Sequence, residues 1–255
     1  MSLLADSARV AWIDMRFIRR NILQVLVTSL VTPLLYLFAF GYGLGQGMTV
    51  DGMDYLSFMI PGIVAMTTMT ACFNNVATKV MLQRTYYQSF DELYLCSVSP
   101  SAIILGKAYG GMVRGLISCA VLYVMGLLLS EDMVLSLGAV LMIVFSCLMY
   151  GLLGVVAGML ANSHLTLTMF TTLVIVPMTF LCGTIFSLDS LGEVLQALIS
   201  ILPLTHTTDC MRAAMLGLDF PWASLAVLLA WSAVFFLISR HVMVKGRARP
   251  GPGGG

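Results

Sequence analysis

Charged side chains are scarce in this chain, since only 10% of its 255 residues are Asp, Glu, Lys or Arg. Soluble domains carry about 25%. Apolar residues make up 59% of the sequence, so too few polar groups are left to cover a water-soluble surface. The chain also lacks a basic stripe interleaved with aromatic residues, which argues against a nucleic-acid partner. The composition therefore indicates a membrane protein whose exterior is solvated by lipid.

Motifs for catalysis and for energy coupling are missing as well. No GxxxxGK[ST] loop is present, so we do not expect this chain to bind ATP or Mg²⁺. The HExxH and GxSxG motifs are absent, and the six cysteines show no metal-ligand spacing, although Cys182 and Cys210 could meet on the outer side. No catalytic residue, cofactor or metal site is expected, and the chain is predicted not to be an enzyme.

Six apolar runs are long enough to cross a bilayer as helices, which takes about 20 residues. They cover residues 22–42, 55–78, 108–129, 133–160, 165–186 and 221–239. Lys and Arg gather in every second connecting segment, and Arg114, near the start of the third run, is assigned to the same side. The opposite segments carry eight acids and one base, Arg212. By the positive-inside bias, the chain is a multi-pass protein of the cell membrane with both termini in the cytoplasm.

Shorter segments have helical periodicity without the length of a span. Residues 3–20 separate an apolar face from a basic one, which predicts a helix lying in the cytoplasmic interface. Segment 86–97 has an apolar face that must be buried by lipid, by the rest of the chain or by a soluble partner. Two outer segments, 190–202 and 205–216, are too short to cross the membrane and are expected to be interfacial or re-entrant.

Two polar stripes run through the predicted spans. One follows the second span and the other the fifth, and the candidate translocation path consists of Thr67, Thr70, Asn74, Thr168 and Thr172. Hydroxyl and amide groups in membrane helices also serve as hydrogen bonds between helices, so both interpretations stand. No Asp or Glu lies within an apolar run, which argues against proton coupling, whereas carbonyl groups of broken helices could still bind sodium.

Three local strings carry a family resemblance. They are YLSFMIPGIVAM at 55–66, the segment from Arg84 through SVSP to LGK at 105–107, and FLCGTIFSLDSL at 180–191 with LPLTHTTDCMRAAMLG at 202–217. Together with the six spans and the N-terminal helix, they make residues 1–244 resemble the permease subunit of ABC-2 type exporters. The similarity is strongest to the permeases that export nodulation factors and drugs. Residues 245–255, rich in Gly and Pro, are predicted to form a flexible tail.

The resemblance implies an all-α membrane fold with six transmembrane helices, an N-terminal interfacial helix, a cytoplasmic coupling helix and short re-entrant outer helices before the last span. The coupling helix would dock on a separate ATPase subunit through Tyr86, Phe90, Asp91, Glu92 and Leu93. The outer helices would cap the exit of the pathway. The residues implied for that cap are Leu191, Leu195, Leu198, His206, Asp209 and Arg212.

The function that the resemblance implies is export driven by ATP. A second copy of the chain would complete the pathway, and two ATPase copies would bind ATP and Mg²⁺ in its place. The substrate stays open among amphipathic, lipid-linked, polysaccharide and drug-like molecules. Two alternatives stay open, namely an ion-coupled secondary transporter or channel and a membrane anchor that transports nothing.

Overall fold

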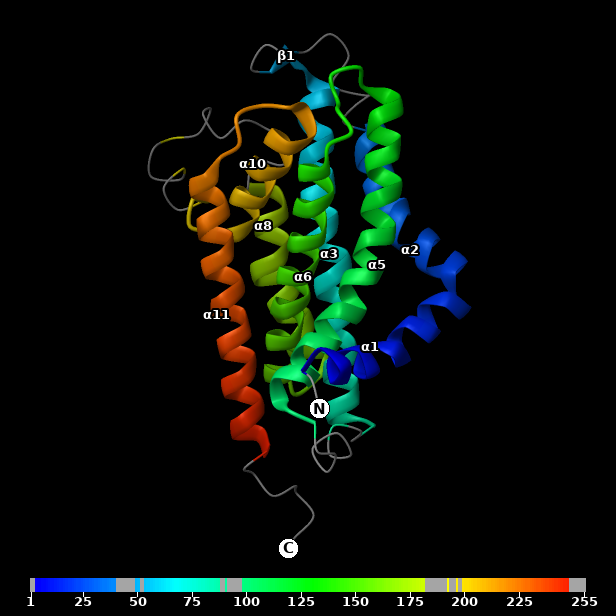
Figure 1. The fold of residues 1–255 in the computed structure, drawn as a ribbon, viewed down its shortest axis with the longest axis vertical. Coiled ribbons are helices and arrows are strands. Elements are labelled where there is room, and N and C mark those ends of the chain that lie inside the picture. Colours follow the sequence, from blue (N-terminus) through cyan, green and yellow to red (C-terminus); the bar gives the residue numbers. More distant parts are fainter. Residues whose placement is uncertain are drawn as a thin grey trace, which may run out of the picture.

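The computed structural model describes residues 3–39, 49–50, 53–87, 90, 98–181, 192, 196 and 199–247. Within them, long helices run side by side along one axis (Figure 1). Four are long and apolar enough to cross a membrane: α3 (Tyr55–Thr85), α5 (Pro100–Leu129), α6 (Leu137–Leu160) and most of α11 (Trp222–Arg247). They match the second, third, fourth and sixth predicted spans. The chain is thus a multi-pass helical protein, as predicted.

The first and fifth predicted spans form shorter helices. The first becomes α2 (Ile22–Tyr36), and the fifth is divided into α7 (His164–Phe170), the π-helical η2 (Thr171–Ile175) and α8 (Val176–Leu181). Because these helices are shorter than a standard span, the six-span arrangement stays a prediction. One addition to the all-α expectation is a small antiparallel hairpin that pairs Thr49 with Asp54 and Val50 with Met53.

Serine caps fix where several helices begin. Ser99 accepts a hydrogen bond from the Ala102 amide and is followed by Pro100, whose missing N–H costs nothing in the first turn of α5. Ser136 caps α6 in the same way, and Ser163 caps α7. Each cap satisfies an amide that a helix end would otherwise leave unbonded.

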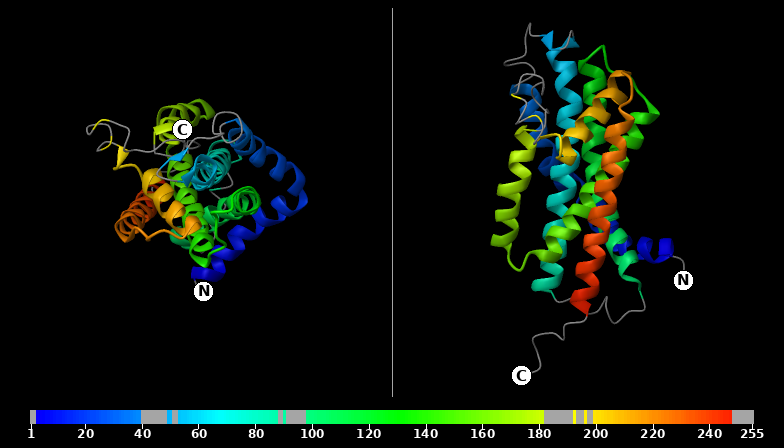
Figure 2. Two further views of the ribbon diagram at one scale, coloured as in Figure 1. Left: turned by 90° about the horizontal axis from the view of Figure 1, so that it is seen from above. Right: turned by 90° about the vertical axis from the view of Figure 1, so that its left-hand side faces the viewer.

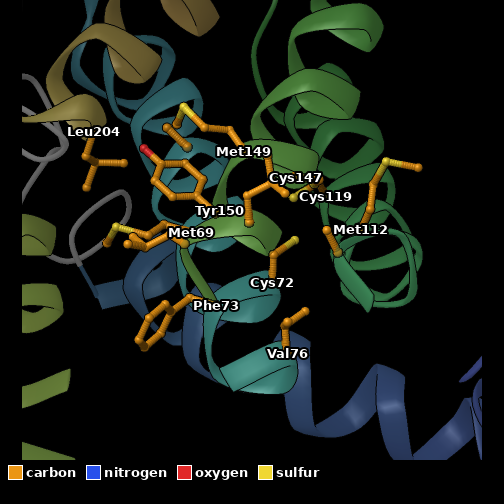
Figure 3. Packing of buried hydrophobic residues seen from close by; sticks show 14 of the residues in the cluster. Met69, Cys72, Phe73, Val76, Met112, Cys119, Cys147, Met149, Tyr150 and Leu204 are labelled. Carbon is orange, nitrogen blue, oxygen red and sulfur yellow. The ribbon is translucent and has the colours of Figure 1, made fainter. Parts of the chain in front are cut away.

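The core is the contact of α3 with α5 and α6, and it is close because glycines face α3. A Cβ placed on Gly154 would lie 2.9 Å from the carbonyl oxygen of Phe73, and one on Gly158 would lie 2.7 Å from that of Ala77. Such small-residue contacts let helix backbones approach in membranes. Figure 3 shows the result, with Tyr150 and the thiols of Cys72 and Cys147 packed between the helices.

The N-terminal helix α1 (Leu3–Arg20) has the predicted bounds and lies across the bundle, near the end where α11 finishes (Figures 1 and 2). It packs on α5 at Gly106, where an added Cβ would lie 2.8 Å from the Ser7 carbonyl oxygen. Val10 and Ala11 are buried, whereas Trp12 is 68% exposed. The position fits an interfacial helix, and its immersion in lipid stays a prediction.

At the opposite end of the bundle, α10 (Pro203–Leu216) packs against α3, α6 and α11. The helix ends at Gly217, whose φ of 67° is the left-handed conformation that glycine adopts readily. The sequence predicted a short helix at 205–216, and the structure has it with its start two residues earlier, at Pro203. Most of the other predicted outer helix, at 190–202, lies outside the described residues.

Candidate functional site

A cavity of about 590 Å³ lies between α2, α3, α5 and the η2–α8 segment. Its size is typical of sites for small molecules. Its walls come from helices far apart in the sequence. The lining residues are Thr28, Pro33, Tyr36, Met66, Thr70, Ala71, Asn74, Asn75, Thr78, Lys79, Arg114, Thr171, Ile175, Val176, Thr179 and Phe180.

The chemistry of the lining changes along the bundle axis. Helix α3 supplies Met66 toward the hairpin end and Lys79 toward the end at which α1 lies, about 20 Å lower at 1.5 Å per residue. The aromatic side chains of Tyr36 and Phe180 belong to the upper part, since α2 and α8 both ascend from the α1 end. The cavity is therefore polar and cationic at one end and largely apolar at the other.

The second-span stripe divides between the cavity and the protein interior. Thr70 and Asn74 line the cavity, whereas Thr67 is 1% exposed and donates a hydrogen bond to the Ile63 carbonyl at 2.7 Å. Thr70 also donates to its own helix, at the Met66 carbonyl, 3.0 Å away. Its hydroxyl oxygen thus offers only acceptor lone pairs to the cavity.

The fifth-span stripe does not line the cavity through its predicted members. Thr168 and Thr172 are exposed and absent from the lining, which instead includes Thr171 and Thr179. The π-helical turn between α7 and α8 is wider than an α-helical turn and changes which residues share a face. Pro177 lies two residues after that turn and has no N–H to donate, which favours the irregular hydrogen bonding.

Arg114 lies deeper in the bundle than its sequence position indicates. The third apolar run begins at residue 108, which predicts a position for Arg114 near the cytoplasmic side. In the structure α5 begins at Pro100, so Arg114 lies halfway along the helix. Its Nη2 donates to the Thr28 hydroxyl at 3.1 Å and so ties α5 to α2. An arginine at such depth in a membrane helix is a marker of function. No Asp or Glu occurs among the described lining residues.

Of the predicted coupling segment 86–97, the structure describes residues 86, 87 and 90, between the end of α3 and the start of α5. Tyr86 is 64% exposed, whereas Phe90 is 1% exposed and belongs to the hydrophobic core of this chain. Three other predicted members, Asp91, Glu92 and Leu93, lie outside the described residues. Tyr86 is thus the exposed one of the two described members.

Sequence analysis did not identify Arg84 as a structural residue. Its guanidinium donates to the carbonyl oxygens of Met159 and Ala161, and to Oδ1 of Asn162 at 2.7 Å. These groups terminate α6, where a cation satisfies unpaired carbonyls and the negative end of the helix dipole. Arg84 therefore anchors the end of α6 beside the predicted coupling segment. No local pattern could reveal this, because the partners lie more than 70 residues away.

The predicted outer cap contains both described and undescribed residues. His206 bonds through Nε2 to the Ser200 carbonyl at 2.8 Å and through Nδ1 to the Ser224 hydroxyl at 3.1 Å, so it joins α10 to α11. The Arg212 guanidinium stacks 3.8 Å from the ring centroid of Phe58 on α3. Asp209 lies half-buried on the same helix. Leu191, Leu195 and Leu198 lie outside the described residues.

The two cysteines expected on the outer side are not both described. Cys210 is a buried free thiol on α10, and Cys182 lies outside the described residues. Burial, with a smaller effect from the Asp209 charge, raises the pKa of the Cys210 thiol to about 12. The thiol is therefore protonated and unreactive at neutral pH.

Comparison with known proteins agrees with this architecture. Residues 9–216 match the family model of the ABC-2 type transporter. The chain is 28% identical over 228 residues to the inner membrane transport permease YadH of Escherichia coli K12, covering 88% of this chain and 89% of that protein. It is 30% identical over 225 residues to nodulation protein J of Rhizobium meliloti, covering 87% and 86%. The chain belongs to the ABC-2 type transporter family.

Proposed function

We propose that this chain is the permease subunit of an ATP-driven exporter and that two copies enclose the pathway for an amphipathic, lipid-linked, polysaccharide or drug-like substrate. The observation that carries the proposal is the cavity with Thr70, Asn74 and Arg114 in its wall, between helices of a family whose members transport. YadH is named as a transport permease, and this chain covers most of its length.

A separate ATPase must supply the energy, because the sequence has no phosphate-binding loop of its own. Family membership implies such a partner in general terms. We place its contact at segment 86–97, on the cytoplasmic side. Arg84 ties the start of this segment to the end of α6, so force applied there would reach the helix core directly. The termini would lie on the same side, in keeping with the positive-inside bias.

A second copy of the chain would close the cavity. The helices α2 and α7–η2–α8 stand outside the core and expose large apolar side chains, such as Leu23 and Leu173 at 76% and 73%. A two-fold axis beside these helices would place two cavities face to face. The α1 helix would then border the entrance from the inner leaflet.

The test is reconstitution of the chain with its cognate ATPase in liposomes, followed by ATP-dependent transport. We expect Tyr86→Glu to reduce transport about tenfold, the loss of roughly 1.4 kcal/mol of coupling, while the free energy of unfolding stays unchanged because Tyr86 is exposed. Leu218→Glu is the matched control, since Leu218 is an exposed apolar residue at the opposite end. Tyr86 is preferable to Phe90, whose replacement would also disturb the core.

A Tyr86→Glu complex that transports normally would remove the coupling assignment. The rival hypothesis of an ion-coupled carrier makes a different prediction: the purified chain alone would move solute down an ion gradient. Transport under that condition, without any ATPase, would overturn the proposed function. A membrane anchor makes a third prediction. The chain would then support no transport in any form, and bulky substitutions at Thr70 and Asn74 would leave its role in the cell intact.

A further inference from the structure

We infer that the cavity between α2, α3, α5 and η2–α8 binds amphiphiles with an anionic headgroup, held at Lys79 and Arg114 with the apolar chain pointing toward Tyr36 and Phe180. The inference rests on the proposed permease function and specifies the substrate class of the same site. It depends on three observations, which concern the sign of the charge, the placement of hydrogen-bond donors and the polarity gradient.

The charges in the lining have one sign. Lys79 from α3 and Arg114 from α5 are the two charged residues among the described lining residues, and both are cations. They lie on different helices, Lys79 toward the α1 end of the cavity and Arg114 halfway along α5. In a surrounding of low polarity, two cations in one wall produce a positive potential that attracts an anion. Arg114 supplies a planar group that matches phosphate or carboxylate, and Lys79 a compact charge.

Three hydroxyl groups of the lining cannot donate to such an anion while they keep their present bonds. Thr70, Thr171 and Thr179 donate their protons to carbonyl groups of their own helices at 3.0, 3.0 and 2.6 Å. They present acceptor lone pairs, which repel an anion and suit ligand hydroxyl or amide donors. The charged donors to an anion are Lys79 and Arg114, with side-chain amides beside them. This favours a headgroup beside the two cations.

The polarity gradient fixes the orientation of the ligand. Above the cations, the wall becomes apolar through Pro33, Tyr36, Ile175, Val176 and Phe180. An amphiphile that entered from the leaflet at the α1 end would keep its headgroup near that end and its chain toward the membrane centre. This is the orientation that it already has in the leaflet, so binding needs no reversal of the molecule. A zwitterionic headgroup would place its own cation beside Lys79 and Arg114 and would bind less tightly.

The test measures ligand-induced stabilisation of the purified chain, without ATPase, in mixed micelles of dodecyl maltoside and an added amphiphile. A ligand that binds the folded state raises its thermal unfolding midpoint with concentration, which gives an apparent Kd. We expect dodecyl phosphate to bind at least about tenfold tighter than dodecylphosphocholine. Inorganic phosphate is the third probe, and it separates a lipid headgroup from a free anion as the source of the charge.

Variants assign the binding to the two cations. Arg114→Gln combined with Lys79→Gln should weaken dodecyl phosphate binding about tenfold or more, whereas Arg114→Lys with Lys79→Arg should stay within about threefold of the unmodified chain. Arg240→Gln, an exposed cation of α11 outside the lining, is the control and should change nothing. If the double Gln variant fails to unfold cooperatively, the single variant Lys79→Gln is measured instead. We then expect its affinity for dodecyl phosphate to fall by at least about threefold.

Three results would overturn the inference: equal affinity for dodecyl phosphate and dodecylphosphocholine, unchanged affinity in the Gln variant, or equal affinity for inorganic phosphate. The last would identify a free-anion site. None of them bears on ATP-driven transport, because the ATPase is absent from the measurement. Conversely, a complex that binds dodecyl phosphate as expected but transports nothing with ATP would reject the permease function alone.

Discussion

The helices α3, α5 and α6 differ from the pair formed by α2 and α7–η2–α8 in how they hold their positions. The first group meets through glycines with almost no space between backbones, and residues 151–159 of α6 are buried without interruption. The second group is short, contains Pro33 and Pro177, and exposes much of its apolar surface. Both groups border the cavity.

This difference indicates that the two groups of helices have different roles. Close glycine packing has no room for relative sliding, so the three-helix core acts as a fixed wall that carries Thr70, Asn74 and Arg114. Proline and π-helical turns lack part of the regular hydrogen bonding and concentrate where helices bend. We therefore expect the pathway to change shape by movement of α2 and η2–α8 against a rigid core.

The largest effect should come from filling the core contact. Gly154→Val would push a side chain into the Phe73 carbonyl, and we expect the free energy of unfolding to fall by about 3 kcal/mol or more. Size-exclusion chromatography and thermal unfolding of the purified chain measure it. In the control Gly138→Ala, the nearest atom is 3.7 Å away, and helix propensity should add about 0.5 kcal/mol. Equal tolerance of both changes would contradict the fixed core.

Removal of the α6 anchor should have the next largest effect. Arg84→Gln leaves the Met159 and Ala161 carbonyls without their charged donor, which should cost about 1–3 kcal/mol. Arg84→Lys keeps the charge but loses the fork of donors, so it should recover only part of that loss. Thermal unfolding of the two variants distinguishes these outcomes. An unchanged midpoint in the Gln variant would mean that the anchor contributes nothing to stability.

Making the second group of helices, α2 and α7–η2–α8, more regular should affect transport more than stability. Pro177→Ala restores a backbone donor near η2, and we expect the free energy of unfolding to change by less than about 0.5 kcal/mol. ATP-dependent transport should fall several-fold, because a continuous α-helix bends less readily. Pro221→Ala, at the loop before α11, serves as the control. A variant that loses stability but transports normally would show that Pro177 has only a packing role.

A last prediction concerns titration and not mutation, at Cys210 on α10. Its pKa of about 12 means that the folded protein holds this proton between pH 9 and 12, whereas the unfolded thiol releases it. Stability should therefore fall as the pH rises through that window. At pH 8 the folded thiol should have about a thousandfold less thiolate than a free cysteine, so alkylation followed by mass spectrometry should find it almost unlabelled. Rapid labelling of the folded chain would contradict its burial.

The helices α3, α5 and α6 were easier to predict from the sequence than α2 and α7–η2–α8. Long apolar runs predicted α3, α5, α6 and α11, because length and hydropathy are local properties. Periodicity could not indicate η2, since it assumes a uniform turn and η2 is wider. Hydropathy could not indicate that α5 begins at Pro100, because it marks where a helix becomes apolar and not where it begins.

Composition and contiguous motifs were enough to predict the membrane environment, the length of the long spans and the absence of an ATP-binding loop. The three-dimensional structure was needed to show that Thr70 and Asn74 share a cavity with Arg114 and Lys79, that Phe90 is buried, and that Arg84 bonds to the end of α6. These relations join helices distant in the chain. Their geometry follows from glycine contacts and proline-broken turns, which set how helices approach one another but leave little trace in local periodicity.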